Sequence, residues 1–584
     1  MRTKLFTLAS LLILASMVLS ACQPAASQPA ADEAQPKVLV GEIGPGDIPT
    51  LDPSLATDNS SLQVIEETFV GLTRMNEETT EIVPGMAESW TVSDDGLTYT
   101  FKLLPNVPWV KYDAIADEVV QVTDCEGNPR MVTAKDYEYG FLRTINPATA
   151  SDYSYVFSFA IEGAAAYNNA ETDDPSTVGV KAIDDTTLEI TFTNPAAYNI
   201  NIAGMWIGSA LPSWLIDGDD CNEARAERWT ETGFFQGYGP YVMKEWIHDS
   251  YITLIKNPFW PGTEEIPQAK IDLVTWHMLD QPPAFAEYEA GNMDYTRVPL
   301  ADMDRIKTDP TLSAELVIAP QLSTYYYGFN TTAPFVDDAR VRRALSMAID
   351  RQAIIDNVTK QEQEPAHWFC RPGLVACPTL DQYPDLGVKY DPEAAKALLQ
   401  EYLDEKGITA ADMDITLMFN TSAAHQRIAE SIQAMWKDVL GIDVKLTNQE
   451  WKVFLQTVKS LETPQIYRSG WNLDYPDANN FTREVVASGG NDNPTDTEGN
   501  PAGGLMWKNE KFEELVRQAA IETDPQKRID LYAQAEQILV YEDAAMIPIY
   551  WYTSVQLTKP YVQRTYSNTG TQHIEKWDID LTKK

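Results

Sequence analysis

The chain has 584 residues, of which 44% are apolar and 10% aromatic, and its formal net charge is −42. This length is more than one ordinary domain needs and predicts two or three domains with buried cores. A surface this acidic repels phosphate backbones, which argues against nucleic-acid binding.

The first residues have the pattern of an export signal. Arg2 and Lys4 precede an apolar run, and a Leu-Ser-Ala-Cys box ends at Cys22. Because the run is too short for a conventional spanning helix, we interpret 1–21 as a lipoprotein signal peptide and Cys22 as the acylated residue. An ordinary signal peptide that ends near a cysteine is the alternative. Residues 22–37 are rich in Ala, Pro and Gln and predict a flexible tether, so we expect an exported bacterial protein anchored to the outer face of the cytoplasmic membrane.

Strand and helix patterns alternate along the rest of the chain. The clearest are an Asp-Gly turn leading into a strand within 94–103, strands over 186–192 and 442–447, and an amphipathic helix over 427–441. Another helix is predicted to begin at Asp524-Pro525, and 488–505 reads as a Gly/Asn/Pro-rich loop. Helical spacing predicts Trp436 and Tyr532 as core residues. The mixture predicts an α/β fold.

Four cysteines follow Cys22. Cys370 and Cys377 lie in a Pro/Gly-rich loop and predict a small disulfide loop in an oxidising compartment. Cys125 and Cys221 also lie in loop-like contexts and could pair, but spacing does not decide their connectivity. None has CxxC spacing, so we expect no metal site.

Motifs for catalysis are missing from the sequence. It contains no P-loop, no HExxH and no G-x-S-x-G, and its five histidines are dispersed. We therefore expect a binding protein without a cofactor rather than an enzyme. The abundant carboxylates keep a secreted hydrolase as the least favoured hypothesis.

The stretch YRSGWNLDYPDANNF (467–481) combines a cation, an anion, an aromatic residue and a glycine. Arg468 and Asp474 would, without context, be a surface ion pair. A free peptide, however, carries an ammonium and a carboxylate that both need partners when they leave water. A carboxylate can bind the ammonium, a guanidinium can bind the carboxylate, and Gly470 would let an extended ligand backbone approach.

Seven sequence blocks carry a family resemblance. They are TLDPSLATDNSSLQVIEETFVGL (50–72), VPGMAESWTVSDDGLTYTFKLLPNVPW (83–109), VTAKDYEYGFLRTINPATAS (132–151), VGVKAIDDTTLEITF (178–192), GYGPYVMKEW (237–246), STYYYGFNTTAPFVDDARVRRALSMAIDRQAII (323–355) and NTSAAHQRIAESIQAMWKDVLGIDVKLTNQEWKVFLQTV (420–458). In this order they resemble extracytoplasmic solute-binding proteins of family 5, the dipeptide- and oligopeptide-binding proteins of ABC importers. The resemblance covers about 38–584. It departs at 110–130, where a longer loop with Cys125 is inserted.

The resemblance implies a bilobal clamshell of the class II periplasmic-binding-protein type with an extra third domain. The implied division is lobe 1 at 38–69, 208–320 and 549–584, the extra domain at 70–207, and lobe 2 at 321–548. Two chain crossings, near Gln321 and Ile549, would form the hinge between the lobes.

The resemblance also implies roles for residues of the binding site. Asp474 matches the position that holds the peptide amine, and Arg468 the position that reads the carboxyl end of short peptides. His425 and Lys360 match positions that read the carboxyl end of other lengths. The ligand strand would pair with Ser469–Asn472 and with the loop Thr57–Ser60. The remaining binding residues implied or inferred are Asn59, Gly470, Trp471, Asn472, Tyr153, Tyr325, Tyr327 and Trp451.

The function implied is that of a monomeric receptor that captures oligopeptides and delivers them to the permease subunits of an ABC importer. An oligosaccharide or another small solute is the alternative ligand, because 15 Trp and 27 Tyr could stack on sugars. A neutral sugar, however, would not need the charges of Asp474 and Arg468.

Overall fold

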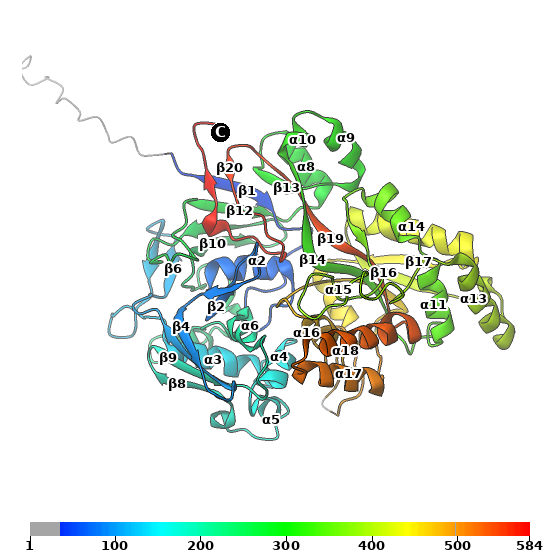
Figure 1. Ribbon diagram of the computed structural model, residues 1–584. Helices are drawn as coiled ribbons and strands as arrows, with labels where there is room; N and C mark the ends of the chain where they lie inside the picture. The colour runs from blue at the N-terminus through cyan, green and yellow to red at the C-terminus, as the bar shows by residue number, and fades with distance from the viewer. Residues whose placement is uncertain (1–34, 497) are drawn as a thin grey trace, which may run out of the picture. The chain divides into compact units, whose positions relative to one another are not determined.

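A computed structural model describes residues 35–496 and 498–584, of which Val38–Lys584 form one unit (Figure 1). The predicted signal peptide, Cys22 and most of the tether lie outside the described residues. Helices and strands alternate along the unit, which confirms the α/β prediction. None of the described helices has the length and apolar character needed to cross a membrane.

Three larger sheets organise the strands. The first has the order β1 (Val38–Glu42), β12 (Leu273–His277), β11 (Tyr251–Lys256) and β10 (Tyr241–Ile247). The second has the order β4 (Ala87–Val92), β5 (Thr98–Leu103), β9 (Thr187–Thr191) and β8 (Val180–Asp184). The third has the order β13 (Tyr295–Arg297), β19 (Met546–Thr558), β14 (Leu316–Phe329), β18 (Ile466–Asn472), β16 (Thr416–Asn420) and β17 (Lys445–Gln449), with β15 (Glu364–Pro365) also paired to β19. Hairpins are formed by β2 (Thr73–Met75) with β3 (Ile82–Pro84), β6 (Val110–Asp113) with β7 (Glu118–Gln121), and β20 (Val562–Gln563) with β21 (Asp578–Ile579).

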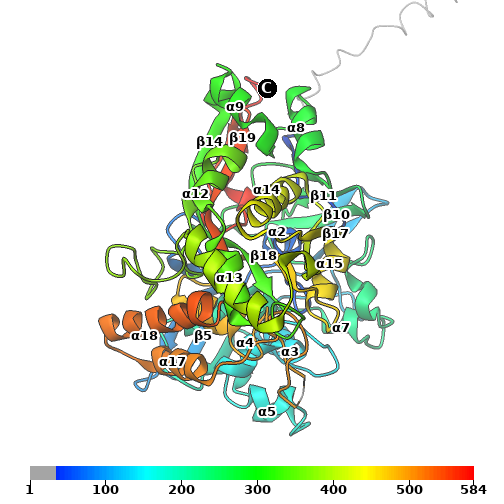
Figure 2. The ribbon, with the colours of Figure 1, turned by 90° about the vertical axis from the view of Figure 1, so that its right-hand side faces the viewer.

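The longer α-helices are α2 (Asn59–Thr68), α3 (Ala134–Thr144), α8 (Gln281–Glu289), α11 (Ala339–Met347), α13 (Pro392–Lys406), α14 (Ala423–Leu440), α15 (Trp451–Val458), α17 (Glu510–Ile521) and α18 (Pro525–Gln537). The shorter ones are α4 (Ser154–Ala160), α5 (Ala164–Asn168), α6 (Asn199–Gly204), α7 (Ser213–Ile216), α9 (Met303–Thr308), α10 (Leu312–Glu315), α12 (Arg351–Ile354) and α16 (Ala478–Phe481). Helix α14 packs on β16 and contacts α11 and α13, and Figure 2 shows α12, α13 and α14 from their outer side.

Local patterns in the sequence account for most of these elements. Tyr99, Phe101 and Leu103 alternate along β5 and are buried, as the predicted strand required. Helix α14 ends at Gly441, whose φ of +72° is the left-handed conformation that glycine adopts without strain. Trp436 is fully buried, so its predicted place in the core is confirmed.

Two further predictions can be compared with the structure. The predicted helix at Asp524-Pro525 is α18: Asp524 caps its N-terminus and Tyr532 is buried. The strand predicted over 442–447 begins later, at Lys445. Ile442 and Val444 are buried, but they precede the strand. The strand starts later than predicted because its pairing with β16 begins only at Thr416 and Lys445.

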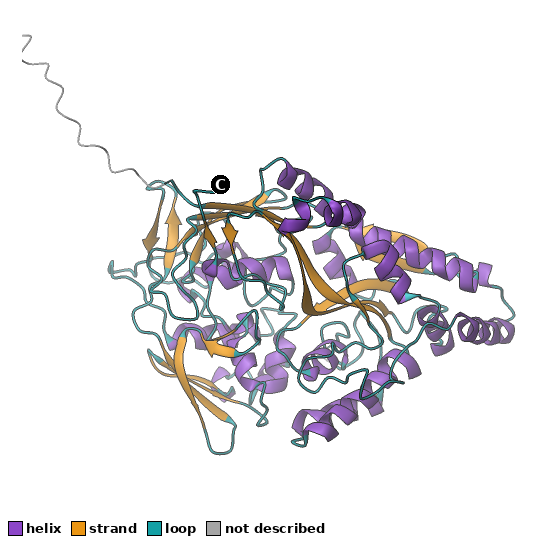
Figure 3. Ribbon diagram, turned by 45° about the horizontal axis from the view of Figure 1, so that its top comes forward, coloured by secondary structure: helices purple, strands orange, loops and turns teal. Residues whose placement is uncertain are grey.

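The strands β14 and β19 are the longest in the molecule's described part, with 14 and 13 residues. They pair antiparallel from Leu316 to Gly328, with register shifts on the way, and form the long central strands of Figure 3. The predicted chain crossings near Gln321 and Ile549 both fall within these strands. The boundaries of the three predicted parts stay a prediction.

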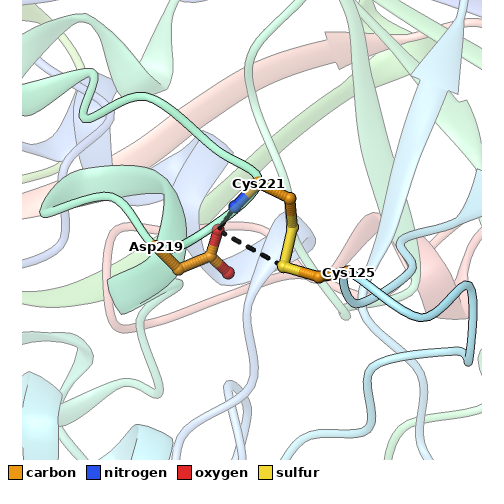
Figure 4. A group of neighbouring side chains, drawn as sticks. All are labelled: Cys125, Asp219 and Cys221. Atoms are coloured by element: carbon orange, nitrogen blue, oxygen red, sulfur yellow. Dashed lines mark hydrogen bonds between the residues drawn. A yellow bond between two sulfur atoms is a disulfide. The ribbon is translucent and has the colours of Figure 1, made fainter.

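Both cysteine pairs form disulfides, Cys370–Cys377 as predicted and Cys125–Cys221, which the sequence left open. The Cys125–Cys221 bridge ties the inserted loop after β7 to a segment 96 residues further on. Asp219 lies beside this bridge (Figure 4). It forms an ion pair with Arg130 at 2.5 Å. Because both sulfurs are bonded to each other, this group offers no thiolate for a metal ion.

Candidate functional site

A cavity of about 530 Å³ lies within Val38–Lys584. Its walls include the loop after β1 with α2, residues around Trp206, and the segment 567–573. The rest of the wall is formed mainly by β18, β19, the N-terminal part of α14, and α15. The volume is in the range of pockets that bind small molecules.

Most of the predicted binding residues line this cavity. They are Asn59, Tyr153, His425, Trp451, Arg468, Gly470, Trp471, Asn472 and Asp474. Three others do not. Tyr325 and Tyr327 are fully buried in β14, because that strand lies between β18 and β19 in the middle of its sheet. Lys360 has a left-handed backbone with φ of +56° after a helical turn, and its ammonium forms an ion pair with Asp304 outside the cavity.

The strand β18 presents a free edge toward this site. On one side, β14 pairs with all of β18, from Ile466 to Asn472. On the other side, the parallel pairing with β16 involves only Ile466 and Tyr467. From Arg468 onward no strand among the described residues occupies that edge, so its backbone groups are available to an extended ligand.

Arg468 lies on this strand with 8% of its surface exposed. Its Nη1 donates to Asn420 Oδ1 at 3.2 Å and its Nη2 to the Tyr552 hydroxyl at 2.5 Å. The guanidinium carbon lies 4.6 Å from the centre of the Tyr325 ring, and the buried Nε has no hydrogen-bond partner. Within the described residues no carboxylate lies within ion-pair distance of it, so the cation is held without a counter-charge.

Gly470 is exposed on β18 two residues further on. A Cβ at this position would lie 3.1 Å from Arg468 Nη2 and 3.1 Å from the Tyr552 hydroxyl. The missing side chain therefore leaves room for the guanidinium as well as for a ligand backbone.

Asp474 follows β18 and faces the same cavity. Its Oδ2 accepts from Asn480 Nδ2 at 2.9 Å, and its backbone N–H donates to Asn480 Oδ1 at 3.0 Å. Burial raises the pKa of Asp474 to about 8, and repulsion from Glu484 adds to this increase. The hydrogen bond from Asn480 acts in the opposite direction and lowers the pKa. No cation of the described chain lies within ion-pair distance. Asp474 is thus a fixed carboxyl group that becomes an anion more readily when a positive group approaches.

His425 lines the cavity at the start of α14, where its Nδ1 lies 3.3 Å from the Tyr325 hydroxyl. Burial, with Arg468 and Arg297 adding by repulsion, holds the pKa of His425 well below its usual value. The imidazole is therefore neutral near pH 7 and can form a hydrogen bond but supplies no positive charge.

Contacts across the cavity hold its walls together. They are the Tyr153 and Trp471 rings, 6.5 Å apart and 8° from parallel, the hydrogen bonds from Trp451 Nε1 to Asp58 Oδ1 (3.3 Å) and from the Ala423 N–H to Asp280 Oδ2 (2.9 Å), and the ion pair of Lys459 with Asp152 (3.2 Å). Each joins segments more than 140 residues apart in the chain. The cavity is thus enclosed by distant parts of the sequence.

Several residues of the site were not predicted. Tyr552 contacts Arg468, and Asn480 holds Asp474. Asp58 lies in the predicted loop Thr57–Ser60 but was not singled out there; it caps α2 and contacts Trp451. The alternating aromatic residues of β19 were a signal for Tyr552, and an aspartate before a helix was a signal for Asp58. Nothing in the local sequence pointed to Asn480.

Comparison with known proteins defines the class. Residues 81–493 match the family model of the bacterial extracellular solute-binding proteins, family 5 (middle region). The oligopeptide-binding protein OppA of Bacillus subtilis (strain 168) is 33% identical over 516 residues, which cover 86% of each chain. The chain therefore belongs to family 5 of the bacterial extracellular solute-binding proteins.

Solved structures show the same fold. The murein tripeptide binding protein MppA of Escherichia coli matches with a TM-score of 0.80 at 28% identity, over 94% of this chain and 99% of that one. The unliganded open form of MppA matches with a TM-score of only 0.59, at 28% identity over 94% of this chain and 98% of that one. The present arrangement is therefore a bilobal clamshell that differs from the open form, and we call it the closed arrangement.

Proposed function

We propose that this protein captures oligopeptides in the cavity between its lobes. Asp474 binds the α-ammonium, Arg468 binds the α-carboxylate of short peptides, and the free edge of β18 pairs with the ligand backbone. The relatives named above, an oligopeptide-binding and a murein tripeptide binding protein, support a peptide as the ligand.

One observation carries this proposal. A buried cation and a carboxyl group face the same cavity, at Arg468 and Asp474, and neither has an ionic partner among the described residues. Removing one partner of a buried ion pair, so that the other charge stays unpaired, costs about 3 kcal/mol or more. A ligand that carries both opposite charges on an extended backbone compensates both groups at once.

The capture is coupled to closure of the clamshell. A peptide that contacts both walls binds the closed arrangement more tightly than the open one. This difference in affinity sets how far the peptide shifts the equilibrium toward the closed arrangement. The receptor then delivers its ligand to a permease in the membrane, and another chain supplies ATP hydrolysis. Cleavage before Cys22 and acylation of its thiol would hold the receptor, as a monomer, at the outer face of the cytoplasmic membrane.

The choice of ligand class can be tested on the purified protein. Mass spectrometry of co-purifying molecules, followed by thermal-shift measurements with peptides of two to six residues and with cello- and xylo-oligosaccharides, separates the two ligand classes. We expect bound peptides and an increase of Tm with free peptides only. Stabilisation by the sugars alone would overturn the proposal, since Trp471 and Trp451 would then act as stacking platforms.

A further inference from the structure

A second group of polar side chains lines the same cavity and has no role in binding the ends of a peptide. It consists of Glu66 on α2, Arg74 on β2, Asn201 on α6, and Thr571 and His573 in the C-terminal segment. We call this group the glutamate pocket. Arg74 Nη1 donates to the Glu66 carbonyl oxygen at 3.2 Å, and Thr571 lies within hydrogen-bonding reach of the Glu66 carboxyl group.

Polar atoms of the glutamate pocket lack partners. Buried atoms without a hydrogen-bond partner among the described residues are Glu66 Oε2, Arg74 Nη2, Asn201 Oδ1 and His573 Nδ1. His573 is 3% exposed, and the side chain of Arg74 is 9% exposed. An unsatisfied buried polar atom destabilises the folded state unless a partner reaches it. Arg74 Nη2 and His573 Nδ1 lie 3.7 and 3.9 Å from Glu575 Oε1, whereas Glu66 Oε2 and Asn201 Oδ1 are hydrogen-bond acceptors. Two unsatisfied acceptors at one cavity wall indicate a hydrogen-bond donor of the ligand.

The charge around the pocket shows which sign this group has. Behind Glu66 lie three further buried carboxylates, Glu67, Glu77 and Glu575, all at 0% exposure. The cations that face these four carboxylates are Arg74, 3.7 Å from Glu575, Lys576, 4.0 Å from Glu77, and Arg564, which interacts electrostatically with Glu77. His573 contributes no charge, because burial, Arg74 and Lys576 hold its pKa well below the usual value.

Four carboxylates thus share three cations in a buried place. Burial is the main reason why the pKa values of Glu66, Glu67 and Glu77 are raised, and neighbouring Glu575 adds to each. The cluster has one more carboxylate than it has cations, and Glu66 is its carboxylate at the cavity wall. A cationic group that approaches from the cavity would meet Glu66 first.

We propose that the glutamate pocket binds the cationic side chain of a lysine or arginine in the ligand, with Glu66 as the contacting carboxylate. This inference rests on the proposed function, because it takes the ligand to be a peptide. An organic cation fits better than a metal ion: within the described ranges, no three carboxylates or imidazoles of this pocket come close enough together to hold one. Asn201 and the neutral imidazole can accept hydrogen bonds from the same ammonium or guanidinium.

The test uses a peptide that binds the wild-type protein and replaces each of its positions in turn by lysine, methionine or Nε-acetyl-lysine. Isothermal titration calorimetry is expected to show one position at which lysine binds about tenfold more tightly than the two neutral residues, which equals about 1.4 kcal/mol. Because acetyl-lysine has the size of lysine without its charge, this part needs no protein variant.

The variant Glu66→Gln removes the contacting charge and keeps the shape. It is expected to abolish the lysine preference and to change binding of the methionine peptide less than about twofold. Glu78→Gln, at an exposed position shortly after β2, is the matched control and should keep the preference. Equal affinity of the lysine, methionine and acetyl-lysine peptides at every position, or a preference that survives Glu66→Gln, overturns the inference while the proposed function stands. If no peptide binds the folded wild-type protein, both fall.

Discussion

Asp474 and Asp477 lie three residues apart, in the same loop, and are used in opposite ways. Both oxygens of Asp477 accept from Arg528, at 2.7 Å each, and the side chain also caps α16. Asp474 has an asparagine as its side-chain partner and no cation. The first carboxylate is satisfied within the protein and contributes to stability. The second is left for a ligand, and its burial without a cation reduces stability.

The largest expected effect follows from breaking the satisfied pair. Asp477→Ala leaves the largely buried Arg528 guanidinium without its partner and is expected to lower the free energy of unfolding by about 3–5 kcal/mol. Asp474→Ala should lower it less, by about 1–3 kcal/mol, because only the buried Asn480 Nδ2 loses its hydrogen-bond acceptor and no cation is left unpaired. Urea denaturation without peptide measures both, and equal losses in the two variants would contradict the distinction.

The second effect concerns the cation of the site. Arg468→Met keeps much of the side-chain volume and is expected to weaken binding of a short peptide with a free carboxylate about a hundredfold, since the carboxylate loses its charge partner. Peptide amides should bind wild type and variant alike. Arg517→Met, at an exposed position on α17, is the control. Calorimetry that finds equal affinity for free carboxylate in wild type and Arg468→Met would remove Arg468 from the site.

The smallest effect is a pH dependence of closure without ligand. Burial raises the pKa of Asp474 to about 8 in the closed arrangement, whereas a carboxyl group in water has a pKa of about 3.9. At a pH between these two pKa values, Asp474 therefore takes up a proton when the empty cavity closes. The equilibrium constant for closing falls as the pH rises and is largest at low pH. From pH 6 to pH 7 the equilibrium constant should fall by up to about tenfold.

Small-angle scattering of peptide-free protein measures this effect as an increase of the radius of gyration with pH. Asp474→Asn cannot titrate and should remove this contribution, while the neighbouring Glu484, also buried with a raised pKa, stays in place. An identical pH profile in the variant would show that Asp474 does not control closure.

The sequence predicted what depends on local pattern. The buried alternation of β5, the glycine that ends α14 and the aspartate that begins α18 are set by residues close together in the chain, and the structure has them as expected. The start of β17 was placed too early, because pairing with β16 and not the local pattern decides where that strand begins.

The candidate site was predictable only in part, for the same reason. The residues around β18 share one short segment, and the cavity contains them. Tyr325 and Tyr327 were expected in the pocket wall, but they are buried because β18 and β19, which are distant in sequence, pair with their strand on both sides. The glutamate pocket combines α2 with residues about 500 positions further on, so no local pattern indicated it.

The central claim is that Asp474 is unpaired because its partner is the α-ammonium of the ligand. A double-mutant cycle tests it most directly: calorimetric affinities of one peptide, with a free or an acetylated N-terminus, for wild type and for Asp474→Asn. We predict that acetylation weakens binding to wild type by about thirtyfold or more and to Asp474→Asn by less than about threefold. An equal loss in both proteins would contradict the account.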